Sequence, residues 1–250
     1  MNKAVISVII PVFNGGRFLS EAIDSVLAQN YDALEIIIID DGSTDNSKEV
    51  ALGYGNKIKY LYQENGGPAK ARNFGLSIAT GDFITFIDAD DVWAKDKISR
   101  QLALFGKNEE LGIVIGLAWK TGFSVKEELD KPGLTPKGTF HLLLGSSLIK
   151  KSVFDRIGLL DEDLFLGDDT DWFNRAKENR IAIAIHRDVV QYYRIHENNI
   201  TNDKRRSNHY VFKVIKKAKD RKMSPDFKPL PAAPKIKTMD DLINYWHSAN

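Results

Sequence analysis

The sequence predicts an α/β protein whose central sheet is open, mostly parallel and flanked by helices. Short runs of β-branched residues with almost no polar content, as at 5–12 and 34–39, indicate strands buried on both faces. Between these runs, apolar residues recur at helical spacing, as at 18, 19, 22, 23, 26 and 27. Strand and helix alternate through the first ninety or so residues, the order of parallel strands joined by right-handed crossovers.

The elements are expected in the following order. Strands at 5–12, 34–39, 58–63 and 82–87 alternate with helices at 18–29, 43–54 and 68–79, the second capped by Ser43 or Thr44. Then come a helix at 95–105, a strand at 113–119, a polar connection at 121–139, a strand at 142–149, helices at 153–157 and 169–178, and strands at 181–185 and 189–194. The polar connection is either a lid over a site or plain surface.

The domain organisation follows from this order and from a change in charge. Residues 1–202 are expected to form one domain with halves at 1–105 and 106–202, and 203–250 to form a basic helical extension with a Pro-rich tail at 228–234. Lys and Arg total 35 against 34 for Asp and Glu, so the whole chain offers no field for nucleic acid. Without cysteine, disulfides, zinc-thiolate sites and thiol nucleophiles are excluded.

Localisation is read from what the chain lacks and from its basic helix. It has no secretory signal and no apolar run long enough to span a bilayer, so a cytoplasmic, soluble protein is expected. Within the basic stretch, apolar residues stand at 211, 212, 214, 215 and 218. This helix either lies on an anionic membrane surface, making the protein peripheral on the inner face, or packs its Val211, Phe212 and Ile215 face on the domain. Packing on the domain is the simpler reading, and we expect it.

Two acidic clusters follow predicted strands, at the sheet edge where ligands bind in such folds. Asp40-Asp41-Gly42-Ser43 suits a helix N-cap, or a carboxylate that accepts from a base or ribose. In Asp88-Ala89-Asp90-Asp91, an extended backbone would point residues 88 and 90 to the same side. Two carboxylates forced together are costly unless a cation or a proton compensates them, and hard oxygen ligands favour Mg²⁺ or Mn²⁺. The alternative is a solvated acidic turn that caps the next helix, a task we assign to Asp91.

A glycine-containing segment lies between these clusters at 63–73. Its glycines permit close backbone approach, Pro68 suits the first turn of a helix, and Lys70 and Arg72 can meet a phosphate or a base. The spacing of a P-loop is absent, and no G-x-G-x-x-G follows the first strand. A P-loop nucleotidase and a dinucleotide-dependent dehydrogenase are therefore disfavoured.

Together these segments resemble the family 2 inverting glycosyltransferases, which have the GT-A fold. The matching motifs are Ser-Val-Ile-Ile-Pro-Val-Phe-Asn at 7–14, Asp-Asp-Gly-Ser-Thr-Asp at 40–45, Asn-Gly-Gly at 65–67 with Ala-Arg-Asn at 71–73, and Asp-Ala-Asp-Asp at 88–91. They occur in the family's order over roughly residues 5–105. The resemblance implies an enzyme that uses a nucleotide sugar and a divalent metal, Mn²⁺ or Mg²⁺.

The resemblance also implies roles for particular residues. The base pocket would be lined by Pro11 and Phe13 with Asp40 on the base, Asp88 would hold the ribose or a metal-bound water, and Asp90 would ligate the metal that bridges the diphosphate. The full implied donor site is Pro11, Phe13, Asp40, Asp41, Gly67, Arg72, Asp88 and Ala89.

A third acidic cluster, Gly167-Asp168-Asp169-Thr170-Asp171-Trp172, is similar to the family's acceptor-side motif. Asp168 stands where Glu is commoner, and Asp169 matches the family's catalytic base, so Asp168 and Trp172 are assigned to the acceptor side. An acid here can also cap a helix, and both roles are compatible. His196, in Tyr-Tyr-Arg-Ile-His-Glu at 192–197, is either a further metal ligand or a structural residue.

The expected reaction moves a sugar from a nucleoside diphosphate sugar, expected to be UDP-linked, to a hydroxyl of a glycan or lipid-linked acceptor. Such reactions build polysaccharide, lipopolysaccharide and other glycoconjugates of the cell envelope. A sugar-phosphate nucleotidyltransferase is the first alternative, but its Gly-rich, Arg-containing loop after the first strand is only faintly imitated at 11–17. The second is a non-catalytic module that binds nucleotide sugars or glycans.

Overall fold

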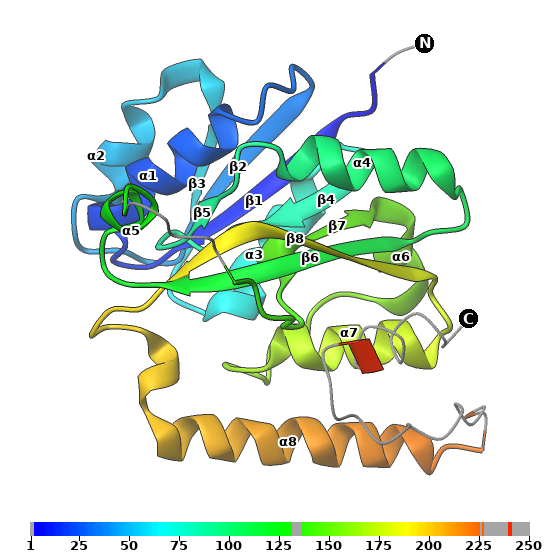
Figure 1. Ribbon diagram of the computed structural model, residues 1–250. Helices are drawn as coiled ribbons and strands as arrows, with labels where there is room; N and C mark the ends of the chain where they lie inside the picture. The colour runs from blue at the N-terminus through cyan, green and yellow to red at the C-terminus, as the bar shows by residue number, and fades with distance from the viewer. Residues whose placement is uncertain (1–2, 132–136, 226, 228–239, 242–250) are drawn as a thin grey trace.

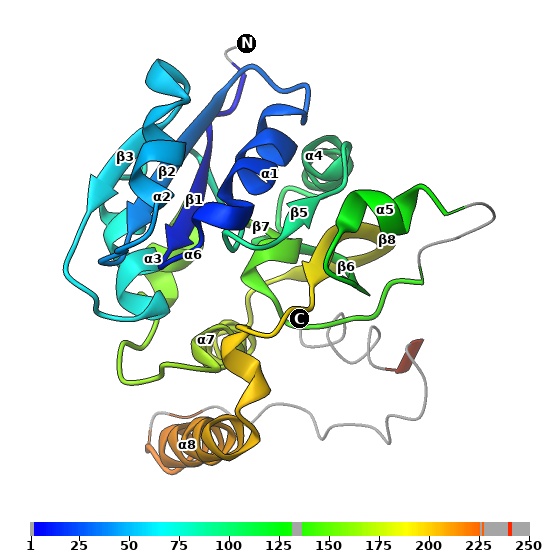
Figure 2. The ribbon, with the colours of Figure 1, turned by 90° about the vertical axis from the view of Figure 1, so that its left-hand side faces the viewer.

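The computed structural model describes residues 3–131, 137–225, 227 and 240–241. Within them, eight strands form one sheet in the order β3-β2-β1-β4-β7-β6-β8-β5. Helices cover both of its faces, and α8 lies beyond α7 (Figures 1 and 2). The α/β class predicted from the alternating apolar runs is confirmed.

The four strands of the first half, β1 (Ile6–Val12), β2 (Leu34–Asp40), β3 (Lys59–Tyr62) and β4 (Phe83–Phe86), are all parallel. In the second half, β6 (Ile113–Thr121) and β8 (Ile183–Arg194) are parallel to each other. Between the halves, β7 (Ser147–Lys150) runs antiparallel to both β4 and β6. The sheet is therefore mixed, and β7 joins its two parallel parts.

Two apolar layers pack against this sheet. One contains α1 (Gly16–Leu27), α2 (Ser47–Leu52) and α4 (Lys97–Lys107), and its core includes Ile10, Ile38 and Leu148. The other contains α3 (Pro68–Ile78), α6 (Lys151–Ile157) and α7 (Asp168–Glu178), with Ile9 and Trp172 in its core. Successive residues of β1 alternate between the layers, and so a strand covered on both faces needs an unbroken apolar run.

Several element predictions need correction. The second helix begins at Ser47 instead of Ser43, because Ser43 is used elsewhere: its hydroxyl accepts a hydrogen bond from the Asn14 N–H at 2.9 Å. The strands predicted at 181–185 and 189–194 are one strand, β8. The strand predicted at 142–149 begins only at Ser147, after a 3₁₀ turn at Leu144–Ser146. A two-residue strand, β5 (Val92–Trp93), was not predicted.

The polar connection at 121–139 contains a short helix, α5 (Val125–Leu129), and two further 3₁₀ turns lie at Gly55–Lys57 and Ile200–Asn202. The basic stretch forms α8 (Lys204–Lys222), as predicted. The Pro-rich segment 228–234 lies outside the described residues. No helix in the described part of the chain combines the length and the apolar character needed to cross a membrane.

The expected packing of α8 on the domain is wrong for three of its apolar residues. Val211, Phe212 and Ile215 are 55%, 72% and 58% exposed, whereas Val214 is 6% exposed. The helix is attached instead by Val214 and by ion pairs, among them Arg221 to Asp171 at 2.8 Å. Lys217 also pairs with Asp161 at 2.6 Å. The apolar positions 211, 212 and 215 therefore face away from the core.

Glu35, near the beginning of β2, is expected to make the free energy of unfolding depend on pH. Its carboxylate accepts hydrogen bonds from Ser7, from Lys59 at 2.7 Å, and from the Thr80 N–H at 2.8 Å. Burial by itself would raise the pKa of Glu35, but these donors outweigh it and lower the pKa to about 2. Because the folded pKa lies below the unfolded value, Glu35 stabilises the fold above about pH 4.5 and this contribution is lost as the pH falls toward 2.

We therefore expect Glu35→Gln to lower the free energy of unfolding at pH 7 by about 2 kcal/mol and to flatten its fall between pH 5 and 2. Urea unfolding at a series of pH values measures both effects. Asp32→Asn is the matched control, since the Asp32 side chain is 93% exposed and pairs only with Lys3 among the ion pairs described. An undiminished pH slope in Glu35→Gln would contradict the assignment.

Candidate functional site

The predicted donor residues lie at the carboxyl edge of the parallel strands. β1 and β2 are in register up to the pair Val12–Asp40, and β4 ends nearby on the other side of β1. The chain leaves all three strands at this edge, so the loops that follow them are brought together.

Asp40 and Asp41 differ in their partners. The two oxygens of Asp40 accept from the Ser43 N–H at 2.8 Å and from the Tyr60 hydroxyl at 2.7 Å. Asp41 accepts from the N–H groups of Gly66 and Gly67, both at 2.8 Å. Gly67 has φ +91°, a conformation that favours glycine. Asp41 thus holds the turn that leads into α3, and Asp40 holds the loop after β2.

Phe13 is an exposed aromatic residue at this edge. Its side chain lies just beyond β1 and is 54% exposed, while Pro11 is half-buried within the strand. Asn14 has φ 51°, and its side chain accepts from the Thr44 N–H at 2.8 Å. The loop carrying Phe13 is therefore fixed to the loop after β2, and its ring is free to stack on a planar ligand.

Arg72 joins the two halves of the site. From α3, its guanidinium donates to Asp88 after β4 at 2.6 Å and to Asp168 at the start of α7 at 2.8 Å. Burial would lower the pKa of Arg72, but Asp88 and Asp168 raise it, so the guanidinium stays charged. Its Nε–H is buried without a hydrogen-bond partner in the described residues. Sequence reasoning placed Arg72 near the donor and missed its pairing with Asp168, which lies 96 residues away.

The backbone at 88–91 differs from the extended conformation that was predicted to bring Asp88 and Asp90 to the same side. The Asp91 N–H donates to the Asp88 carbonyl at 3.0 Å, so the backbone is a tight turn and not extended. Asp90 Oδ2 lies 2.9 Å from His196 Nε2. Burial and the neighbouring Asp88 raise the pKa of Asp90. The structure therefore brings Asp90 and His196 together.

Asp91 does not cap the next helix, which begins only at Lys97. It is buried, and its carboxylate accepts from the Arg194 N–H at 3.0 Å and from the Gln191 side chain. Burial, with Asp90 and Asp88 nearby, raises the pKa of Asp91 well above its ordinary value. Asp91 instead fastens the end of β8 to the acidic turn.

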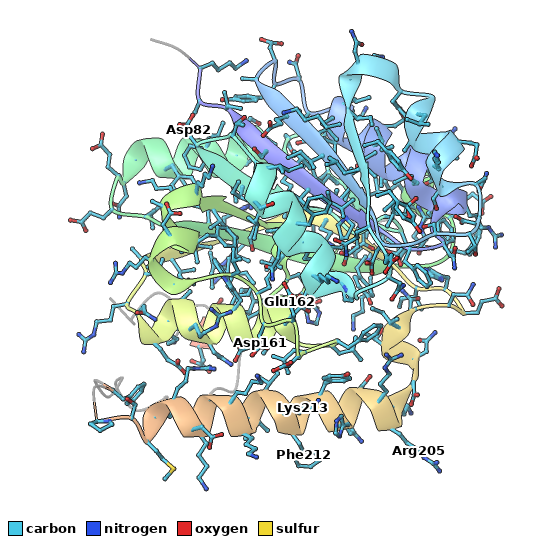
Figure 3. The ribbon with its side chains drawn as sticks, turned by 180° about the vertical axis from the view of Figure 1, so that it is seen from behind. Asp82, Asp161, Glu162, Arg205, Phe212 and Lys213 are labelled. Atoms are coloured by element: carbon cyan, nitrogen blue, oxygen red, sulfur yellow. The ribbon has the colours of Figure 1, made fainter. Side chains whose placement is uncertain are left out.

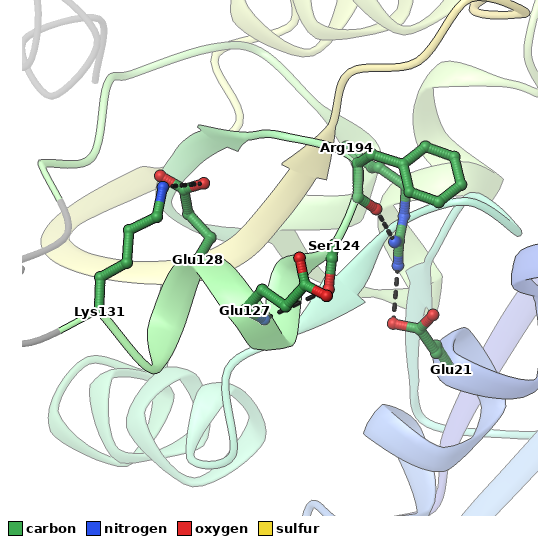
Figure 4. A pocket seen from close by; sticks show the side chains of 7 residues that line it. Glu21, Ser124, Glu127, Glu128, Lys131 and Arg194 are labelled. Carbon is green, nitrogen blue, oxygen red and sulfur yellow. Dashed lines mark hydrogen bonds and ion pairs between the residues drawn. The ribbon is translucent and has the colours of Figure 1, made fainter.

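Arg194 is a site residue that sequence reasoning missed. Its guanidinium donates to Glu21 of α1 at 2.9 Å and to the Phe123 carbonyl (Figure 4). It also donates to the Asp90 carbonyl at 2.7 Å, and the residue is 1% exposed. It lines a pocket of about 390 Å³ together with Glu21 and residues of α5. The sequence signal that could have indicated it is an arginine at the end of the apolar and aromatic strand predicted at 189–194.

On the acceptor side, Asp168 and Asp169 begin α7. Asp168 is buried and paired with Arg72, whereas Asp169 is half-buried and accepts from the Thr170 N–H at 2.6 Å. Burial, with Asp168 beside it, raises the pKa of Asp169 to about 7. A carboxyl group that titrates near neutrality is suited to accept a proton at neutral pH.

Trp172, assigned to the acceptor side, is fully buried. Its ring lies 4.6 Å from that of Phe154, and its N–H donates to the Gly158 carbonyl at 3.0 Å. It therefore holds α7 in the core instead of offering a surface to an acceptor.

The residues present fit a divalent cation whose coordination shell would be completed by the substrate. In the described ranges, no group of three or more acidic or histidine side chains is arranged to hold a metal. Asp90 and His196 nevertheless offer one oxygen and one nitrogen 2.9 Å apart. Mg²⁺ and Mn²⁺ are commonly bound through one or two carboxylates plus substrate phosphates and water. Asp90 would also gain from a cation, because burial and then the neighbouring Asp88 disfavour its charged form and raise its pKa.

Comparison with solved structures places this architecture in the class of GT-A glycosyltransferase folds. The mannosyltransferase PcManGT of Pyrobaculum calidifontis, in complex with GDP-Man and Mn²⁺, superposes with a TM-score of 0.73 at 19% identity over 99% of this chain and 71% of that chain. Residues 1–349 of S. aureus TarS, in complex with UDP-GlcNAc, give 0.69 at 21% identity over 90% and 68%. The family model for glycosyl transferase family 2 matches residues 7–158. The chain belongs to that family.

Relatives found by sequence similarity are also described as glycosyltransferases. An uncharacterized glycosyltransferase of Rickettsia typhi is 32% identical over 212 residues, which is 79% of this chain and 66% of the relative. The glycosyltransferase GlyG of Streptococcus pneumoniae is 40% identical over 116 residues, covering 45% of this chain and 38% of GlyG. The chain thus spans just under two thirds of the length of the Rickettsia relative.

Proposed function

We propose that this protein transfers a sugar from a nucleoside diphosphate sugar, most simply a UDP sugar, to an acceptor hydroxyl with inversion at the anomeric carbon. The observation that carries the proposal is the bridge made by Arg72, which pairs with Asp88 on the donor side and with Asp168 on the acceptor side. One guanidinium thereby places two acid clusters, 80 positions apart in the chain, around one space. The donors bound by PcManGT and TarS support the class of substrate.

In the proposed reaction, Asp169 accepts the proton of the acceptor hydroxyl as that oxygen attacks the anomeric carbon from the face opposite the leaving group. The new glycosidic bond forms while the bond from the anomeric carbon to the diphosphate oxygen breaks, and the nucleoside diphosphate departs with the bonding electrons. Because the Asp168 carboxylate is paired with Arg72, Asp169 is the carboxylate at the start of α7 that remains to take the proton.

Asp90 and His196 would hold Mn²⁺ or Mg²⁺, which when bound neutralises the charge that grows on the diphosphate. In this proposal Phe13 stacks on the base, Asp40 and Asp41 fix the loops around it, and Asp88 faces the ribose. Residues 1–105 then form the donor half and 106–202 the acceptor half of a domain extended by 203–250.

We propose a glycan or lipid-linked acceptor of the cell envelope, modified on the cytoplasmic side of the membrane with the protein in peripheral contact. No nucleic acid partner is proposed, because Lys and Arg balance Asp and Glu at 35 to 34.

Thermal unfolding with a panel of nucleotide sugars tests the donor site, because a ligand that binds the folded state raises the melting temperature. We expect one class of nucleoside diphosphate sugar to raise it in the presence of Mn²⁺, and Asp90→Asn to remove the Mn²⁺-dependent part of the rise. Asp96→Asn is the control, since Asp96 is about half exposed and pairs with Arg100.

The same donor should release its nucleoside diphosphate when an acceptor is supplied. Release of pyrophosphate from a nucleoside triphosphate would instead indicate a nucleotidyltransferase. Donor binding without turnover over a broad acceptor panel would indicate a binding module.

A further inference from the structure

The helix α8 has one face attached to the domain and one face without a partner in the described residues. On the attached face, Val214 packs within 3.1 Å of the position that a Cβ on Gly167 would take. Arg206 lies over the ring of Phe165 at 3.8 Å, and Arg221 pairs with Glu178 at 2.7 Å. These contacts fix the rotation of the helix, because they lie along one stripe of its surface.

The opposite stripe, which we call the outer face of α8, combines apolar and cationic side chains. Its centre is Phe212, 72% exposed, with Val211 and Ile215 beside it at 55% and 58%. The cations Arg205, Lys216 and Lys219 are exposed on the same side at helical spacing from Phe212. Phe212 and Arg205 point away from the rest of the molecule (Figure 3).

The charged side chains of α8 are almost all positive. The helix carries nine Lys or Arg residues and a single acid, Asp220. Such a helix is rich in cations at its polar positions and exposes large apolar residues between them, the pattern of helices that lie in the plane of a membrane surface. A second copy of the chain is a poor occupant, because a two-fold contact through this face would set like charges against each other.

We propose that the outer face of α8 binds an anionic lipid surface, with Phe212 and Ile215 inserted among the acyl chains and Arg205, Lys216 and Lys219 on the headgroups. Lipid binding by α8 does not depend on the proposed function, but its consequence for the acceptor site does. Val214 contacts Gly167, the residue before Asp168, so docking would place the acid pair about 10 Å, one helix diameter, from the lipid.

Binding of the full chain to phosphatidylcholine vesicles with and without phosphatidylglycerol tests the proposal. We expect co-sedimentation that depends on phosphatidylglycerol and weakens with salt. Phe212→Ser should weaken vesicle binding about tenfold through lost apolar insertion. Lys216→Gln with Lys219→Gln should weaken it by at least about tenfold, since each lysine near an anionic surface contributes about fivefold.

Each variant has a matched control elsewhere on the surface. Leu52→Ser removes an apolar side chain of α2 that is 53% exposed, and Lys48→Gln with Lys57→Gln removes the same charge from exposed positions. Both controls should bind vesicles as the unaltered chain does. All these side chains are exposed, so the melting temperatures should be unchanged.

Three results would overturn the proposal. They are no binding of the unaltered chain to phosphatidylglycerol vesicles, equal binding by Phe212→Ser and Leu52→Ser, or a dimer in solution that Phe212→Ser converts to monomer. Donor-induced thermal shifts measured on the same variants keep the two proposals apart. Vesicle binding without any donor shift would contradict the proposed function and leave the lipid surface standing.

Discussion

Asp169→Asn is expected to lower the rate of sugar transfer by about 10²–10⁴-fold while leaving donor binding intact. The amide keeps the size of the side chain and its place beside Thr170, whose N–H lies 2.6 Å from Asp169, but it cannot take a proton at neutral pH. Steady-state transfer to an acceptor and donor-induced thermal shifts measure the two quantities separately. Asp163→Asn, in an 85% exposed carboxylate of the preceding loop, is the control.

The pH profile of transfer gives an independent reading of the same residue. Burial raises the pKa of Asp169 to about 7, and a general base works only when ionised. The rate should therefore rise with pH through about 7 and level off above it. In Asp169→Asn the residual rate should lose this rise. Transfer near the unaltered rate in this variant, with donor still bound, would show that another group is the base.

Arg72→Met is expected to destabilise the fold by about 3–5 kcal/mol and to abolish transfer, because it leaves a buried carboxylate without its partner. Asp168 is 6% exposed at its side chain and depends on the Arg72 guanidinium at 2.8 Å. Urea unfolding measures the loss. The matched control is Arg100→Met, whose partners Asp96 and Asp188 are about half exposed, and for which we expect at most about 1 kcal/mol.

Arg72→Lys separates charge from geometry. A lysine keeps the positive charge but cannot donate in a fork to Asp88 and Asp168 together. We expect this variant to be more stable than Arg72→Met and still defective in transfer. If Arg72→Met and Arg100→Met lower the free energy of unfolding by the same amount, the bridge between the halves does not stabilise the fold.

The sequence predicted most clearly what depends on local pattern. The runs at 5–12 and 34–39 are strands because a strand covered on both faces has no place for a polar side chain. The acids at 40–41 and 88–91 lie at one edge because parallel strands bring their carboxyl ends together. Short elements were beyond this reasoning, since two residues of β5 show no period.

Long-range pairing left no local trace. The antiparallel direction of β7 is set by its neighbours β4 and β6, and an apolar tetrapeptide reads the same in either direction. Asp91 was assigned to a helix cap because the next helix was its nearest possible partner, yet it bonds to Arg194 103 residues away. For α8, periodicity indicated that apolar residues are present but not which of them meet the domain.

The long strand β8 has a consequence for how such a protein can change over evolutionary time. Its twelve residues run from Ile183 to Arg194, and its pairing with β6 shifts register near Leu117. Beyond this bulge, Gln191 and Arg194 both reach Asp91, and His196 follows two residues later. A deletion of one residue there would turn every later side chain to the opposite face of the sheet. The length of β8 must therefore be inherited unchanged if these contacts are to be kept.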